Sequence, residues 1–213
     1  MRKTDIVTST PQQDRAIATY ERLLETAGKL LAARDFEKVS TNLIAEQAGV
    51  SPPALYRYFS DKYDLIGAAG TRWTERKDKS IFVISRRIRS ELDFVLTTSM
   101  VEDLLHEMIE ITESVTGGVA IMKCLRTVPR LNHIVNQSHD KMAQALSDAA
   151  VEAYPGIDGA QIYRQVRLSM EIGYSAMEFV LGDPRVDRKQ TLRDASLAIA
   201  AFSDLVKSDP ISD

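Results

Sequence analysis

The chain has 213 residues, of which 44% are hydrophobic and 27% are charged, and its formal net charge is -3. A mean hydropathy of -0.18 and the lack of any apolar run of about 18 residues exclude a transmembrane span. The N-terminus also lacks the apolar core of a signal peptide. A single cysteine, Cys124, excludes an internal disulfide and argues against a cysteine-based zinc site. We therefore expect a cytoplasmic protein with no membrane partner, no metal and no cofactor.

The charge distribution excludes a protein that binds nucleic acid through bulk charge alone. The isoelectric point is about 5.7, and residues 1–65 hold nine lysines and arginines against nine aspartates and glutamates. Any affinity for DNA would have to come from the local placement of a few side chains and from two copies acting together.

The first elements predicted are a flexible tail over residues 1–14 and an amphipathic helix from about 15 to 33. The tail is polar and without periodicity, and a minor-groove arm using Arg2 and Lys3 is an alternative for it. Apolar residues recur in the helix at spacings of three and four. They are Tyr20, Leu23, Leu24, Ala27, Leu30 and Leu31.

Residues 40–62 predict two short helices that pivot on Gly49. Ser40 is a suitable N-cap for the first helix, and Gly49 can adopt the left-handed backbone that a tight turn requires. Ser51 is expected to cap the second helix, with Pro52 at its first position. The apolar side chains that would hold this pair on the core are Ile44, Ala45, Ala48, Val50, Leu55 and Phe59.

This pattern resembles the N-terminal module of the tetracycline-repressor (TetR) family of transcriptional regulators. The resemblance covers roughly residues 17–69, and it implies a homodimer in which each subunit inserts the helix that starts at Ser51 into a major groove. Two-fold symmetry of the protein then predicts a near-palindromic operator. The motif stands here as Ile44-Ala45-Glu46-Gln47-Ala48-Gly49-Val50-Ser51-Pro52-Pro53-Ala54-Leu55-Tyr56-Arg57-Tyr58-Phe59-Ser60-Asp61-Lys62.

The resemblance also implies which side chains meet double-stranded DNA. Asn42 is the best candidate for a hydrogen bond to a base, preferentially adenine. The tip of the second helix offers no side-chain hydrogen bonds, so that apolar contact and groove shape should matter more there. Arg57 is interpreted equally well as a phosphate contact or as a solvated side chain. The complete set of predicted DNA contacts is Ser40, Thr41, Asn42, Ser51, Pro52, Pro53, Ala54, Tyr56, Arg57, Tyr58 and Lys62.

Beyond Lys62 the sequence is helical in pattern to its end, which predicts an all-α fold of about nine helices. We expect helices near 61–79, one or two within 81–115, and others near 119–127, 131–154, 159–181 and 186–207. The predicted division is a three-helix DNA-binding domain at 15–65, with the helix-turn-helix, and a larger helical domain at 66–213. The resemblance implies that the larger domain dimerises and binds a small effector.

The last two long helices carry a regular apolar stripe in which small residues would let another helix approach closely. We interpret this stripe as the dimer seam, and a core stripe within one chain is the alternative. The predicted seam residues are Ile162, Val166, Ser169, Gly173, Met177, Val180, Leu192, Ala195, Ile199 and Phe202.

A pocket for a hydrophobic or planar effector would need apolar, adaptable side chains, although each candidate could equally be plain core. The candidates are Trp73, Phe82, Phe94, Met100, Met108, Met122, Cys124, Tyr163 and Met170. Arg86, Arg87 and Arg89 form a basic cluster, which is either a solvated helix face or a counter-charge for an anionic ligand.

Enzymatic functions find little support in the sequence, and we predict no catalytic residue. His106, His133 and His139 are the only histidines, and none has the spacing of a zinc hydrolase helix. No nucleophile elbow or phosphate-binding loop is present. The function predicted is a ligand-responsive repressor that releases its operator on binding a small effector. The alternative is a ligand-independent module that organises DNA or recruits other proteins.

Overall fold

The structure is a computed structural model that describes residues 11–91 and 96–208. In this part of the chain it contains nine α-helices, two short 3-10 helices and no strand, which confirms the predicted all-α fold. The α-helices are α1 (Pro11–Ala33), α2 (Thr41–Gln47), α3 (Pro52–Leu55), α4 (Lys62–Glu91), α5 (Thr98–Ser114), α6 (Gly118–Thr127), α7 (Asn132–Ala153), α8 (Gly159–Gly182) and α9 (Arg188–Ser208). The 3-10 helices are η1 (Phe36–Lys38) and η2 (Pro129–Leu131).

Helix α1 begins earlier than its periodicity suggests. It starts at Pro11, whereas the sequence predicted a start near Arg15. Proline is favourable at the first helical position because that position has no intrahelical partner for an N–H group. Residues 11–14 are therefore helical, and the remainder of the predicted tail, with Arg2 and Lys3, lies outside the described residues.

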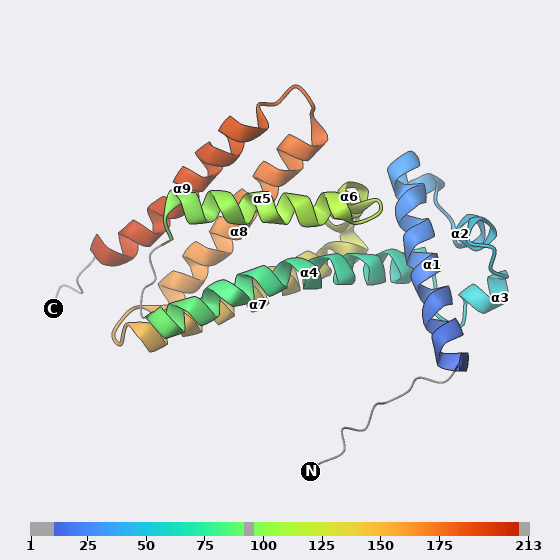
Figure 1. Ribbon diagram of the computed structural model, residues 1–213, viewed down its shortest axis with the longest axis horizontal. Helices are drawn as coiled ribbons and strands as arrows, with labels where there is room; N and C mark the ends of the chain where they lie inside the picture. Colours follow the sequence, from blue (N-terminus) through green and yellow to red (C-terminus); the bar gives the residue numbers. More distant parts are fainter. Residues whose placement is uncertain (1–10, 92–95, 209–213) are drawn as a thin grey trace, which may run out of the picture.

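Helix α4 is longer than predicted and links the two ends of the molecule. It spans 30 residues, which corresponds to about 45 Å at 1.5 Å per residue. Figure 1 shows it running from the side of α1 to the opposite end of the bundle, and it packs against α7. The domain boundary predicted at residue 65 falls inside this helix, so the same rigid rod enters both the N-terminal module and the bundle.

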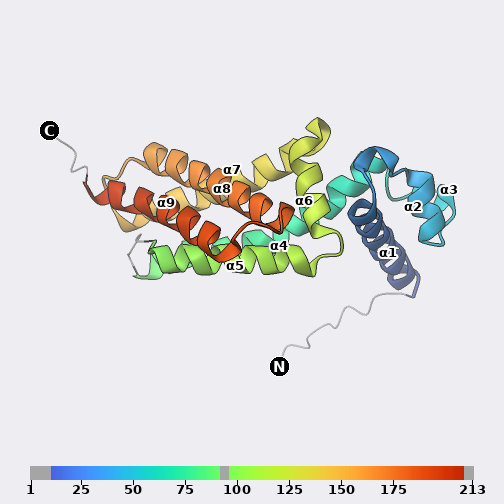
Figure 2. The same ribbon diagram turned by 90° about the horizontal axis from the view of Figure 1, so that it is seen from above.

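The C-terminal bundle is built from long helices packed side by side. Helix α7 lies between α4 and α8, while α9 packs on both α5 and α8 (Figures 1 and 2). Helix α6 contacts α1, α4, α5, α7 and α8, and it stands between the N-terminal module and the rest of the bundle (Figure 2). Among the described helices, none combines the length and the apolar character needed to cross a bilayer.

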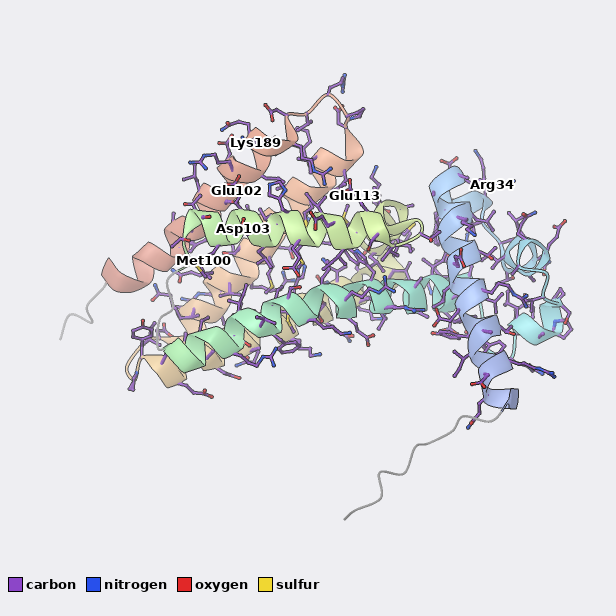
Figure 3. All side chains as sticks on the ribbon, viewed as in Figure 1. Arg34, Met100, Glu102, Asp103, Glu113 and Lys189 are labelled. Carbon is purple, nitrogen blue, oxygen red and sulfur yellow. The ribbon has the colours of Figure 1, made fainter. Side chains whose placement is uncertain are left out.

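Ion pairs fasten α5 to α9 at the surface of the bundle. The guanidinium of Arg188 donates two hydrogen bonds of 3.0 Å each to the two carboxylate oxygens of Glu113. Arg193 Nη1 lies 3.3 Å from Glu102 Oε2. Figure 3 shows Glu102 and Glu113 projecting from the side of α5 that faces α9. These pairs join α5 and α9 at two points along their length.

The N-terminal module meets α6 through two glycines. A Cβ atom at Gly28 of α1 would lie 2.1 Å from the carbonyl oxygen of Thr116. A Cβ atom at Gly117, whose φ is +70°, would lie 2.1 Å from the carbonyl oxygen of Gly28. Both obstructing atoms belong to the backbone and cannot rotate away. The close approach of α1 to the α5–α6 connection thus depends on the lack of a side chain at both positions.

We expect Gly28→Ala to lower the free energy of unfolding by about 1–3 kcal/mol, because the backbone must shift to admit the methyl group. Glycine-to-alanine changes inside helices normally stabilise by up to about 1 kcal/mol, so the sign is diagnostic. Urea denaturation measures the effect. Gly182→Ala is the matched control, since its methyl group would meet only the flexible side chain of Lys123. Equal or higher stability of Gly28→Ala would contradict the close contact.

Candidate nucleic-acid interface and effector cavity

The turn between α2 and α3 has the geometry that its residues predicted. Gly49 has a φ of +61°, and a Cβ there would meet no atom within 4 Å, so its left-handed backbone is the reason for glycine. The N–H of Gly49 donates to the carbonyl of Glu46 at 3.1 Å, and the N–H of Val50 donates to that of Ala45 at 2.9 Å. This pair of bonds is a Schellman motif, which ends α2 and turns the chain sharply.

The starts of the two helices differ in how they are capped. Ser40 Oγ accepts a hydrogen bond of 3.2 Å from the N–H of Leu43, as expected of an N-cap. Ser51 occupies the N-cap position of α3, but its side chain makes no capping hydrogen bond. The Ser51 side chain therefore does not cap α3 as expected. Pro52 in the first turn favours the helix, because its ring fixes φ near the helical value.

Helix α3 carries several of the side chains predicted to contact DNA, and buried residues hold it on the core. It is followed directly by a turn over residues 56–58, so the helical part is shorter than the sequence suggested. Leu55 and Phe59 are buried and hold the segment on the core, as predicted. The side chains that face solvent at this tip are Ser51, Pro52, Pro53, Tyr56 and Arg57, with Ala54 and Tyr58 partly covered.

The two helices are also joined by their polar side chains. The hydroxyls of Thr41 and Tyr56 lie 3.0 Å apart, which links the start of α2 to the end of α3. The ring of Tyr58 lies against Tyr20 of α1, with 6.3 Å between the ring centroids. Tyr56 is therefore the more accessible of the two predicted tyrosine contacts, while Asn42 is exposed at the start of α2.

Lys62 lies differently from the other predicted DNA contacts. Its Nζ donates a hydrogen bond of 3.1 Å to the carbonyl of Phe36 and lies 4.2 Å from the centroid of the Phe36 ring. Glu37 Oε2 is 3.7 Å away. The ammonium group thus ties the start of α4 to η1 and is only partly accessible.

A cavity of about 120 Å³ lies inside the bundle between α4, α5, α7 and α8. Most of its wall is apolar, and α5 contributes only apolar side chains to it. Of the predicted pocket residues, Met100, Met108 and Met170 line the cavity; Met100 is labelled in Figure 3. The described residues that line it include Ile81, Ile84, Leu96, Val101, Leu104, Leu105, Met142, Leu146, Val166, Gly173, Met177 and Ile199.

The other predicted pocket residues lie elsewhere. Trp73, Met122 and Cys124 are buried in the core, and Trp73 Nε1 donates to Thr112 Oγ1 at 3.1 Å. Phe82 and Tyr163 are partly exposed. Phe94 and the side chains of Arg87 and Arg89 lie outside the described residues, while Arg86 is exposed.

One wall of the cavity carries polar groups that sequence reasoning missed. They are Lys77, Asp78, Ser138, His139 and Tyr174, from α4, α7 and α8; Ser169 of α8, whose hydroxyl donates to the carbonyl of Gln165, also lines the cavity. Three hydrogen bonds organise them. Ser138 Oγ donates to Asp78 Oδ1 at 2.7 Å, Tyr174 Oη donates to the carbonyl of Met122 at 2.6 Å, and His139 Nδ1 lies 3.2 Å from Glu171 Oε1. The only sequence signal was the position of Lys77 one helical turn after Trp73, on an apolar face.

Burial decides the protonation of this wall. It lowers the pKa of His139 to about 4, so the ring is neutral at physiological pH. Burial would raise the pKa of Glu171, but hydrogen bonds from Arg167 and His139 outweigh it and hold that pKa at about 2. Burial also lowers the pKa of Lys77 to about 8, against the opposing field of the Asp78 carboxylate. Lys77 is therefore mostly protonated at pH 7, although burial makes its charged form unfavourable.

The stripe predicted as a dimer seam is for the most part packed inside a single chain. Its buried members are Ile162, Val166, Gly173, Met177, Val180, Leu192 and Ile199, while Ser169, Ala195 and Phe202 are partly exposed. The outer faces of the same helices carry large apolar side chains that the sequence reading passed over. Leu168 and Phe179 of α8 are 50% and 55% exposed, and Leu197 of α9 is 51% exposed.

Within the described residues no group of three or more histidine, cysteine, aspartate or glutamate side chains is arranged to hold a metal ion. The geometry therefore consists of a helix-turn-helix at one end and an apolar cavity with one polar wall in the bundle. The helix-turn-helix is an element that many DNA-binding proteins use to enter the major groove.

Comparison with known proteins gives a family match for the N-terminal module. Residues 23–69 match the family model described as bacterial regulatory proteins, tetR family. A comparison with curated proteins gave no match. The match covers the helix-turn-helix module, where the sequence motif predicted it.

Solved structures share the fold at low sequence identity. A tetR-family regulator from Streptomyces coelicolor is 20% identical with a TM-score of 0.62, and 90% of this chain and 83% of that chain are covered. A tetR-family protein from Mesorhizobium loti is 14% identical with a TM-score of 0.63, covering 90% of this chain and 98% of that one. RolR in complex with resorcinol is 17% identical with a TM-score of 0.53, covering 94% and 98%.

Proposed function

We propose that this chain acts in the cytoplasm as a homodimeric repressor that holds a near-palindromic operator and releases it when a small molecule enters the bundle cavity. The observation that carries the proposal is the course of α4. This helix begins at Lys62, directly after the reading segment, and its side chain Lys77 lines the cavity. Any ligand that moves α4 also moves α2 and α3, which form the reading head of the subunit.

The Gly28–Gly117 contact supports the same coupling by a second route. Helix α1 belongs to the N-terminal module, and it touches the start of α6, which packs on α4, α5, α7 and α8. Because the contact is between backbones, a displacement of α6 is transmitted to α1 without slack. Coupling of this kind between two sites typically amounts to about 1–3 kcal/mol, or 5- to 150-fold in affinity.

The cavity favours a ligand-responsive regulator over a solid module that only organises DNA. A packed bundle would leave no space of about 120 Å³ among methionine and leucine side chains. RolR, which has the same fold, is described in complex with resorcinol, a small planar molecule. We propose that the cavity of this chain takes a ligand of comparable size.

The outward apolar face of α8 and α9 is proposed as the seam of the dimer. Leu168, Phe179 and Leu197 would be covered by the same residues of a second copy, because a two-fold axis pairs each surface patch with itself. Two reading heads would then lie on one face of the DNA, with half-sites about 34–36 Å apart or a multiple of that distance.

The experiment that tests the proposed function is selection of duplexes from random DNA by the purified full-length protein at physiological salt. We expect a two-fold symmetric motif. The selected duplex then serves as a probe, and its affinity is measured by fluorescence anisotropy with and without small-molecule ligands. Failure to enrich any motif with a folded, dimeric protein would overturn specific operator binding.

Asn42→Ala should cost about 1–3 kcal/mol of binding at one base pair of the operator and leave other positions unchanged, because Asn42 is exposed at the start of α2 and able to pair with adenine. Anisotropy with operators substituted at each position measures this. Gln47→Ala, at the exposed far end of α2, is the control. An equal loss on all sequences would show that Asn42 reads no base.

Lys62→Ala should lower the stability of the N-terminal module by about 1 kcal/mol, because Nζ is bonded to the carbonyl of Phe36 and packs on its ring. Denaturation compared with Lys38→Ala, an exposed lysine of η1, measures that loss. Lys62 is also among the predicted DNA contacts, and a contact between its ammonium group and a DNA phosphate is tested separately by the salt dependence of operator affinity. A slope reduced by about one unit supports the contact, and an unchanged slope leaves Lys62 a purely structural role.

A further inference from the structure

The polar wall of the bundle cavity contains one group whose hydrogen-bonding capacity is unused. Ser138, His139 and Tyr174 each have a polar partner, and the carboxylate of Asp78 accepts from Ser138. Lys77, in contrast, has no hydrogen-bond acceptor and no carboxylate within ion-pair distance among the described residues. Its ammonium group can donate three hydrogen bonds, and it donates none of them to residues that the structure describes.

The surroundings of Lys77 stabilise a cation without satisfying it. The side chain is only 7% exposed, although lysine is rarely buried without a partner. Nζ lies 3.9 Å from the centroid of the Trp73 ring and 5.5 Å from that of Tyr174. The faces of these rings attract the positive charge but accept no strong hydrogen bond. Space for an acceptor exists on the cavity side, since Lys77 is part of the cavity wall.

We propose that this cavity binds a small organic monocarboxylate, whose carboxylate pairs with Lys77 Nζ and whose apolar body lies against the methionine and leucine side chains of α5, α7 and α8. The inference rests on the proposed function, because it names the chemical class of the effector. One anionic head suffices, because the remaining polar groups of the wall already have partners.

The size of the cavity limits the apolar body of the ligand. A space of about 120 Å³ is somewhat smaller than the cavities of about 150 Å³ that hold benzene in protein cores. Met100, Met108, Met142 and Met170 can rearrange to fit a planar ring or a short chain. Benzoate-like acids and short alkyl acids are accommodated when these methionines move aside, whereas long acyl chains would extend beyond the cavity.

The charges around Lys77 favour an incoming anion. The Asp78 carboxylate acts on Lys77 through its field, but its Oδ1 accepts from Ser138, and burial raises its pKa. His139 faces Lys77 from α7 and is neutral, while Glu171 behind it is paired with Arg167. From α8 the facing group is the phenol of Tyr174, and α5 and α9 contribute only apolar side chains to the described lining. A ligand carboxylate would supply the missing counter-charge.

The test is a titration of the full-length protein with benzoate and hexanoate and with their neutral analogues benzyl alcohol and 1-hexanol. Calorimetry gives the affinities, and the fluorescence of Trp73, the single tryptophan of the chain, reports occupancy beside Lys77. We expect the carboxylates to bind about tenfold or more tightly than the alcohols at pH 7. Above pH 8 the affinity of the carboxylates should fall by up to about tenfold per pH unit, while that of the alcohols stays constant.

Lys77→Met should abolish the preference for carboxylates and leave the binding of the alcohols unchanged. Lys79→Met, an exposed lysine on the same helix, should retain the preference. The proposal is overturned if neutral analogues bind as tightly as the acids, if neither series binds, or if Lys77→Met loses both series equally.

Operator affinity measured in parallel separates this inference from the proposed function. Carboxylate binding that depends on Lys77 but leaves the operator bound would support the site and remove its regulatory role. Release of the operator by neutral molecules alone would support regulation and overturn the carboxylate site.

Discussion

Phe179→Arg is expected to produce a folded monomer that has lost most of its operator affinity. Phe179 is the most exposed large apolar side chain of α8, and Leu168 and Leu197 extend the same outward surface over α8 and α9. In a two-fold dimer the substitution occurs twice, so that two guanidinium groups would lie in an interface from which water is excluded. The desolvation cost of unpaired charges amounts to several kcal/mol per ion.

The loss of affinity follows from the loss of the second reading head. Two linked heads bind cooperatively, and linkage commonly raises affinity by about 10²- to 10⁴-fold over one head. We expect Phe179→Arg to lose affinity by a factor in this range. Sedimentation velocity gives the mass, and anisotropy with the selected operator gives the affinity.

Val83→Arg is the matched control, because Val83 is 54% exposed but lies on α4. It should remain dimeric and bind normally. Dimers of Phe179→Arg with full affinity would show that the seam lies on another face. Dissociation caused by Val83→Arg would point to α4 instead.

Lys77→Met is expected to stabilise the ligand-free protein by roughly 3 kcal/mol at pH 7. The pKa of Lys77 falls from 10.5 to about 8 in the folded chain, and each pKa unit corresponds to about 1.4 kcal/mol. The folded state holds the proton less tightly than the unfolded state. The free energy of unfolding of the wild type is therefore lowest below pH 8 and rises between pH 8 and 10.5. At pH 7 the full destabilisation by the buried charge is present.

Chemical denaturation between pH 7 and 9 measures this effect. The wild type should gain stability as the pH passes 8, whereas Lys77→Met should be nearly flat and Lys79→Met should follow the wild type. Higher pH is avoided because burial raises the pKa of the Cys124 thiol, which makes the folded state lose stability as the unfolded thiol ionises. A Lys77→Met protein less stable than the wild type at pH 7 would contradict an uncompensated buried charge.

Substitutions that stabilise a protein often remove a function of its binding site, and Lys77→Met is expected to follow this relation. A buried, unpaired lysine lowers stability at every pH where it is protonated. Strongly shifted ionisable groups in a cavity are typical of functional sites, and Lys77 is such a group in this bundle.

The helix-turn-helix could be predicted from the sequence because its determinants are local. The left-handed backbone at Gly49, the cap at Ser40 and the burial of Leu55 and Phe59 all depend on residues within one or two turns of each other. The helical pattern of the remaining chain was equally local, apart from the length of α4 and the early start of α1.

The bundle shows what a linear pattern leaves open. Periodicity reveals that α8 has an apolar stripe, but not whether that stripe faces α5 and α7 or a second chain. Tertiary packing buries Ile162, Val166 and Met177 within one chain and leaves Leu168 and Phe179 outside. The most regular stripe belongs to the core, because several helices of the same chain already cover it.

The sequence by itself determined the fold class, the positions of most helices and the helix-turn-helix module, because these depend on spacing, caps and turns between near neighbours. Only the tertiary structure decided where the cavity lies and that Lys77 stands on its wall beside Trp73, His139 and Tyr174. His139 and Tyr174 are far from Lys77 in the chain, and the packing of α4, α7 and α8 brings them together. The sequence alone predicts a lysine at the surface, and only the packing of the surrounding helices buries Lys77.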